Sequence, residues 1–329
     1  MTSLALKKPN AWRWTLPISM LLLATVSLLI EQVSLDLQGL SQFFTQSLTH
    51  YQSVIIWQWR APRIIAALVI GAALGLSGAI FQSLVKNPLG SPDVTGFNVG
   101  AYTGVLLAMA LLGTSFVWTV SGAILGGLCS AILVYLFAYR NGLSGFRLII
   151  VGIAISAMLG AFNLWLTLTV SLDTAMTAAL WSAGSLNGIT WQKLLPCLIL
   201  LLLLIGAATL CQKRMRLLEM GDDSAAGLGI SVNSTRLQLM LVGVCLTAIP
   251  TAITGPIAFI SLSAPQIAKR LHPHHESTLT GAAMMGAALL LGADFIAQYA
   301  LGQITLPVGL VTISLGGLYL VYLIRREAK

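Results

Sequence analysis

The chain consists mainly of apolar segments of about twenty residues, which short polar turns separate. As an α-helix, a segment of that length crosses a bilayer core of roughly 30 Å. The seventh and eighth segments share a turn at Gly255-Pro256, so their bounds are the least defined. The pattern predicts an all-α polytopic membrane protein with one transmembrane domain over residues 1–329. It has ten expected spans, at residues 14–32, 62–84, 95–113, 116–139, 147–170, 191–211, 235–253, 256–271, 279–299 and 306–324.

Composition excludes a soluble globular domain. Hydrophobic residues make up 57% of the chain and charged residues only 9%, against about a quarter charged in ordinary domains. The mean hydropathy is +0.88. The net charge of +8 is spread over short loops, which fits topology signals better than a phosphate-binding patch. We therefore expect a lipid bilayer and no nucleic acid as a partner.

Positive charge also predicts the orientation. With a cytoplasmic N-terminus, only Arg60, Arg63 and Lys193 of the 18 lysines and arginines lie outside. This bias follows the positive-inside rule and places both termini in the cytoplasm. The cations expected inside are Lys7, Lys8, Arg13, Lys86, Arg140, Arg147, Lys213, Arg214, Arg216, Arg236, Lys269, Arg270, Arg325, Arg326 and Lys329.

The most polar inner segment is the loop expected over residues 213–234, which contains KRMRLLEMGDDSAAGLGISV. Gly221 can end a first short helix, and Asp222-Asp223 can begin a second, where the helix dipole favours carboxylates. Gly227 and Gly229 can end that second helix. Two short helices at the membrane surface would form a stiff protrusion. We expect it to contact a soluble partner that pushes on the protein.

Two further polar segments flank the second span. On the inner side, Pro88 and Pro92 fix a rigid turn over residues 87–93, which can serve as a gate or only as a hairpin. On the outer side, residues 33–60 form an interfacial segment. Its apolar piece Val54-Ile55-Ile56-Trp57 is too short to span, so we expect it at the membrane interface.

Arg60 and Arg63 lie outside, against the charge bias. They can reach lipid phosphates along their apolar stems. Alternatively they form a docking point for an acidic partner, because arginine pairs with carboxylates through a bidentate fork.

Sequence motifs for chemistry are absent. There is no Walker A, HExxH or GxSxG sequence, so we expect no nucleotide site, no bound cofactor and no enzyme activity in this chain. Asp294 is the only carboxylate well inside a span, and it can be functional or a helix-packing hydrogen-bonder. An ion-coupled transporter would need a clearer charge relay. His272, His274 and His275 can bind a metal but fit a solvated inner turn better, and four isolated cysteines, Cys129, Cys197, Cys211 and Cys245, fit core positions.

Several long motifs resemble the iron-siderophore and vitamin B12 ABC importer permeases, the FecCD type. The resemblance covers about residues 55–328, and RMRLLEMGDD and AIFQSLVKNPLGSPDVTGFN are most similar to ferric enterobactin permeases of bacterial inner membranes. The motifs are RAPR from Arg60, GAALGLSGAIFQSLVKNPLGSPDVTGFNVGA from Gly71, LWSAGSLNG from Leu180, GDDSAAGLGI from Gly221, GPIAFISLSAPQIAKRL from Gly255 and LPVGLVTISLGG from Leu306.

The resemblance implies a type II importer for a ferric siderophore, such as a catecholate. It implies two permease subunits, two cytoplasmic ATPases that bind ATP and magnesium, and a periplasmic binding protein. Arg60 and Arg63 would meet the binding protein, and Asn87, Pro88 and Leu89 would narrow the cytoplasmic end of the path. The residues expected to couple to the ATPase are Leu218, Gly221, Asp222, Asp223, Ala225, Ala226, Leu228 and Gly229.

Two positions depart from the family pattern. Gln266 stands where the family usually has histidine, and Gln298 stands where it has arginine. The missing arginine implies weaker docking through this subunit, which agrees with a non-identical second permease, although a homodimer stays open. Other cargoes within the family are another iron chelate, haem or cobalamin. An ion-coupled secondary transporter is the remote alternative.

Overall fold

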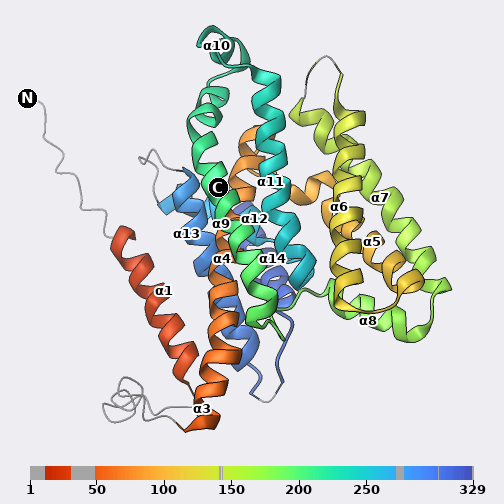
Figure 1. Ribbon diagram of the computed structural model, residues 1–329. Helices are drawn as coiled ribbons and strands as arrows, with labels where there is room; N and C mark the ends of the chain where they lie inside the picture. Colours follow the sequence, from red (N-terminus) through yellow and green to blue (C-terminus); the bar gives the residue numbers. More distant parts are fainter. Residues whose placement is uncertain are drawn as a thin grey trace, which may run out of the picture.

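The computed structural model describes residues 12–30, 49–140, 142, 144–271, 278–302 and 304–327, and over these residues the regular structure is helical (Figure 1). A π-helical turn (η1, Ile55–Arg60) and a 3₁₀ turn (η2, Pro92–Thr95) join the α-helices. The α-helices are α1 (Trp12–Leu29), α3 (His50–Val54), α4 (Ala61–Val85), α5 (Phe97–Leu112), α6 (Phe116–Ala138), α7 (Gly145–Thr169), α8 (Leu172–Ser182), α9 (Trp191–Glu219), α10 (Asp222–Gly227), α11 (Val232–Thr254), α12 (Ile260–Leu271), α13 (Thr278–Tyr299) and α14 (Val308–Glu327).

The predicted all-α polytopic fold is confirmed, and each of the ten predicted spans coincides with a helix. Among the described residues, six helices are long and apolar enough to cross a bilayer; α5 and parts of α1 and α14 are shorter apolar helices. The six are the continuous helix over residues 50–85 together with α6, α7, α9, α11 and α13.

The eighth predicted span is shorter than its apolar segment. α12 has 12 residues, which at 1.5 Å per residue gives a helix of about 18 Å, well short of the bilayer core. Pro256 disfavours helical backbone at the residue before it, and Gly255 there adopts a φ of 71°. The segment therefore begins as irregular backbone and becomes helical only at Ile260.

Two short elements differ from the pattern-based prediction. The piece Val54-Ile55-Ile56-Trp57 is helical and continues without a break into α4; residues 33–48 of the outer segment lie outside the described residues. α8 was not predicted, because its 11 residues are too few to span and are interrupted by Asp173. Along α8, Leu172, Met176 and Leu180 are exposed.

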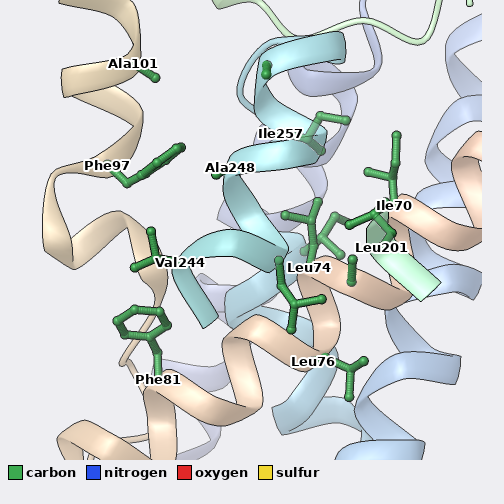
Figure 2. Close-up of a cluster of buried hydrophobic side chains, with 14 of the residues drawn as sticks. Ile70, Leu74, Leu76, Phe81, Phe97, Ala101, Leu201, Val244, Ala248 and Ile257 are labelled. Carbon is green, nitrogen blue, oxygen red and sulfur yellow. The ribbon is translucent and has the colours of Figure 1, made fainter. Parts of the chain in front are cut away.

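α4 lies at the centre of the bundle and packs most extensively against α13, with α11, α12 and α9 also in contact. The α4 and α13 backbones meet closely: a Cβ added at Gly75 would lie 2.2 Å from the carbonyl oxygen of Ala282. Such small residues allow helices to approach within a membrane. Figure 2 shows buried side chains from distant segments in one cluster, among them Ile70 and Leu74 of α4, Phe97 of α5, Leu201 of α9 and Val244 of α11.

The bundle has two distinct ends. α10 projects from one end, and α3 and α8 lie at the opposite end (Figure 1). These are called the α10 end and the α8 end below. Polar side chains from distant parts of the sequence meet at each of them.

Candidate functional site

The polar segment at the α10 end is shorter than predicted. Residues 213–219 form the last turns of α9, and residues 232–234 begin α11, so only residues 220–231 lie between the two long helices. Lysine, arginine, leucine, methionine and glutamate are good helix formers, which explains why α9 continues. It ends before Gly221, whose φ of 115° favours glycine. The first of the two predicted short helices is therefore the end of α9, and α10 is the second.

α10 is anchored on one side and exposed on the other. Leu218, at the end of α9, and Ala225 are buried at 5% and 0% exposure. Of the other residues expected to couple to an ATPase, Gly221 and Asp222 are half-buried, and the exposed ones are Asp223, Ala226, Leu228 and Gly229. The helix thus exposes mostly small, neutral residues, together with the Asp223 carboxylate and part of the Asp222 carboxylate.

Asp222 connects α10 to two other helices. Its Oδ1 accepts from Nη2 of Arg236 on α11 at 2.8 Å, and it lies 3.4 Å from Nζ of Lys86, the residue that ends α4. The Arg236 side chain is 11% exposed, whereas those of Asp222 and Lys86 are 45% and 48% exposed. The pair with Arg236 is thus the better shielded of the two.

The predicted gate turn follows Lys86 directly. Oδ1 of Asn87 accepts from the Leu89 backbone N–H at 2.9 Å, and the Leu89 side chain is 54% exposed. Nε2 of Gln266 on α12 donates to the Pro88 carbonyl oxygen at 2.7 Å. Gln266 therefore holds the turn against α12.

Asp93, at the start of η2, follows the turn. Its carboxylate accepts from the Asn98 amide on α5, which ties η2 to that helix. Burial raises the pKa of Asp93 to about 6, because a low-dielectric environment disfavours the charged carboxylate.

A cavity of about 650 Å³ separates α10 from the end of α4 and the start of α7. Its wall is largely polar and includes Lys86, Arg147, Asp222, Asn233 and Arg236. Packed apolar side chains do not fill the space between α10 and α4. The position of α10 over α4 therefore depends on contacts between polar side chains such as Asp222 and Lys86.

At the α8 end, Arg63 of α4 and Asp294 of α13 form a bidentate ion pair. Nε of Arg63 donates to both carboxylate oxygens at 3.1 and 3.0 Å, and Nη2 donates to Oδ1 at 2.8 Å. The side chains are 14% and 1% exposed. Nε2 of Gln298 also donates to Asp294, at 2.7 Å, and Nη1 of Arg63 donates to Oδ1 of Asn187 at 2.5 Å. Of the two predicted roles for Asp294, this geometry supports helix packing.

Arg60 contacts a different helix. Its Nη1 donates to the backbone carbonyls of Ser27, Leu28 and Ile30, at the end of α1. These carbonyls lie at the C-terminal end of α1, where the helix dipole favours a cation. Arg60 therefore fastens α1 to the central helix, and sequence reasoning gave no sign of this contact.

The other predicted candidates remain separate from both clusters. Lys193 donates to the Gly188 carbonyl oxygen at 3.1 Å and lies over the Phe116 ring. His272, His274 and His275 lie outside the described residues. Among the residues that are described, no group of three His, Cys, Asp or Glu side chains is placed to hold a metal ion.

Comparisons with known proteins agree with this fold. The model of the FecCD transport family matches residues 19–326. The ferric enterobactin transport system permease protein FepG of Escherichia coli is 55% identical over 84% of each chain. The hemin transport system permease protein HmuU of Yersinia pestis is 34% identical over 82% of this chain and 83% of its own.

A solved structure of a metal-chelate type ABC transporter in an inward-facing conformation superimposes with a TM-score of 0.86 at 26% identity, and covers 97% of this chain and 100% of the other. The fold and these matches define a transmembrane permease of the ATP-binding-cassette transporter class. More specifically, the chain belongs to the FecCD transport family.

Proposed function

We propose that this chain is the transmembrane permease subunit of an importer that moves a ferric catecholate siderophore, ferric enterobactin, into the cytoplasm. The observation that carries the proposal is the 55% identity to the E. coli ferric enterobactin permease over 84% of both chains. Relatives named for the transport of iron-hydroxamate, achromobactin, hemin, an unspecified siderophore or iron are 30–35% identical. The higher identity favours the catecholate over those cargoes.

The proposal includes partners that supply energy and cargo. The sequence contains no Walker A motif, so ATP and magnesium would bind to two cytoplasmic ATPase subunits. A second permease, non-identical to this one, would complete the path, and a periplasmic binding protein would deliver the chelate. The chain would lie in the bacterial inner membrane with the α10 end and both termini in the cytoplasm, as its positive-inside charge supports.

Complementation tests the cargo. The chain would be expressed in a strain that lacks its own ferric enterobactin permease subunit but retains the other components, and ⁵⁵Fe uptake would be measured. Uptake of ferric enterobactin is expected. In strains that lack the corresponding permease, ferric hydroxamate and haem labelled with ⁵⁵Fe, and cobalamin labelled with ⁵⁷Co, should stay at background. Uptake of one of those three in strains that lack the corresponding permease, without ferric enterobactin uptake, would replace the proposed cargo.

At the α10 end, the proposal assigns ATPase contact to the exposed surface of α10. Asp222→Arg combined with Gly227→Leu should abolish ATPase co-purification, uptake or both, because the pair changes the charge and the shape of this helix. Lys213→Gln, an exposed cation on α9, is the control. The assignment would fail if the double variant assembled and transported like the control.

At the α8 end, the proposal assigns docking of the binding protein to the surface around Arg60 and Arg63. Both guanidinium groups already have partners within this chain. An incoming carboxylate must therefore share or displace those contacts, which supports weaker docking through this subunit than through a second permease. Surface-plasmon-resonance measurement of binding-protein affinity for Arg60→Glu and Arg63→Glu complexes tests this, and an unchanged affinity for both would place docking elsewhere.

A further inference from the structure

The contact between α10 and the gate turn passes through one carboxylate. α10 packs against α9 and α11, and Lys86 at the end of α4 lies across the polar cavity from it. Asp222 spans this gap with the 3.4 Å contact to Lys86 and holds α11 through the 2.8 Å contact to Arg236. A displacement of α10 thus reaches α11 directly and reaches the end of α4 through Asp222.

The gate turn is fastened from a second side as well. Lys86 has a left-handed backbone with a φ of 53° and is followed at once by Asn87, so a shift of Lys86 redirects the turn. The Pro88 carbonyl is held by Gln266 of α12. The turn is therefore connected to α12 by the Gln266–Pro88 hydrogen bond and to α10 by the Lys86–Asp222 contact. These two connections are called tethers below.

The two tethers differ in strength. Gln266 is buried at 7% exposure and its bond is 2.7 Å long, whereas the Lys86–Asp222 contact is half-exposed and longer. A solvated ion pair is weak and rearranges easily. The Lys86 tether is consequently the one that a movement of α10 can change.

We propose that Asp222 and Lys86 are positioning residues that transmit a displacement of α10 to the gate turn, with Arg236 holding Asp222 in place. This inference rests on the proposed function, since it names the residues that connect the proposed ATPase contact to the turn that the sequence predicts as the cytoplasmic gate. Neither residue touches the cargo in this scheme. Lys86 acts on Asn87, Pro88 and Leu89 only through its own position.

A double-mutant cycle tests the link in the assembled transporter, with ⁵⁵Fe-enterobactin uptake expressed per co-purified ATPase. Lys86→Gln should lower uptake about two- to fivefold, the range of an exposed ion pair. Asp222→Asn should lower it at least as far, and adding Lys86→Gln to Asp222→Asn should cause no further loss, because the contact is already absent. Lys86→Arg, which keeps the charge, should retain uptake.

Lys213→Gln and Glu219→Gln are matched controls, since both are exposed charges on the last turns of α9. The inference is overturned if Lys86→Gln transports like these controls, if the two losses multiply, or if Lys86→Gln no longer co-purifies with the ATPase. The wild-type chain in the same assay distinguishes failure of the proposed function from failure of this inference. If the wild type does not take up ferric enterobactin, the proposed function is refuted. If the wild type and Lys86→Gln take it up equally, only the proposed role of Lys86 and Asp222 is refuted.

Discussion

Two ion-pair clusters at opposite ends of the bundle connect α4 to other helices, and they differ in burial. At the α8 end, Arg63 and Asp294 are 14% and 1% exposed and make a bidentate pair. At the α10 end, Lys86 and Asp222 are 48% and 45% exposed and make one contact at 3.4 Å. A shielded, bidentate pair has one favourable geometry, whereas a solvated pair exchanges with water at little cost. We infer that the Arg63–Asp294 pair holds α4 in one position at the α8 end, and we call this pair the fixed joint. The Lys86–Asp222 pair lets α4 and α10 shift relative to each other, and we call it the adjustable joint.

The largest effect is expected at the fixed joint. Asp294→Ala should lower the free energy of unfolding by about 3–5 kcal/mol, because it leaves the Arg63 guanidinium buried without its carboxylate. Chemical denaturation of the purified complex in mixed micelles measures this. The control is Arg63→Met with Asp294→Leu, which removes both charges and should be nearly neutral. A small loss for the single variant would mean that the joint is solvated, contrary to the comparison.

A smaller effect is expected where Arg60 fastens α1. Arg60→Gln should cost about 1 kcal/mol, since it removes a cation from the end of a helix. Hydrogen exchange of the α1 amides should rise, with α6, which does not pack against α1, unchanged as the internal reference. Equal protection of α1 in both proteins would show that its packing, rather than Arg60, holds it.

The smallest effect on stability is expected at the adjustable joint. Lys86→Gln should change the free energy of unfolding by less than about 1 kcal/mol, because solvent already screens the pair. The difference from wild type should shrink further as salt is raised, which denaturation at two salt concentrations detects. A loss as large as that of Asp294→Ala would remove the distinction between the two ends.

Sequence reasoning predicted the long apolar helices well and the short elements poorly. The α4 and α13 segments carry an unbroken apolar signal, so their expected and observed bounds agree closely. α12 is shorter than predicted because a hydropathy pattern does not reveal the non-helical backbone conformation that Gly255-Pro256 imposes. α8 and the helical extension over residues 50–60 were missed because neither is long enough to span by itself.

The candidate sites were predicted as residues but not as contacts. Arg63 and Asp294 were each notable for their position, yet they are 231 residues apart in the sequence, and Lys86 is 136 residues from Asp222. Pairing over such distances is decided by how α4 packs against α13 and α11, for which a single sequence gives no local signal. For Arg60 the sequence predicted contact with lipid phosphates or with an acidic partner, and it gave no signal for the hydrogen bonds to backbone carbonyls at the end of α1.

The coupling ratio in proteoliposomes tests the central claim most directly. Iron atoms imported as ferric enterobactin per ATP hydrolysed would be measured for the complete transporter with the wild-type chain and with Lys86→Gln. The account predicts ATP-dependent import by the wild type and a lower ratio for Lys86→Gln, because α10 would move without carrying the gate turn. An equal ratio for the two proteins would contradict it.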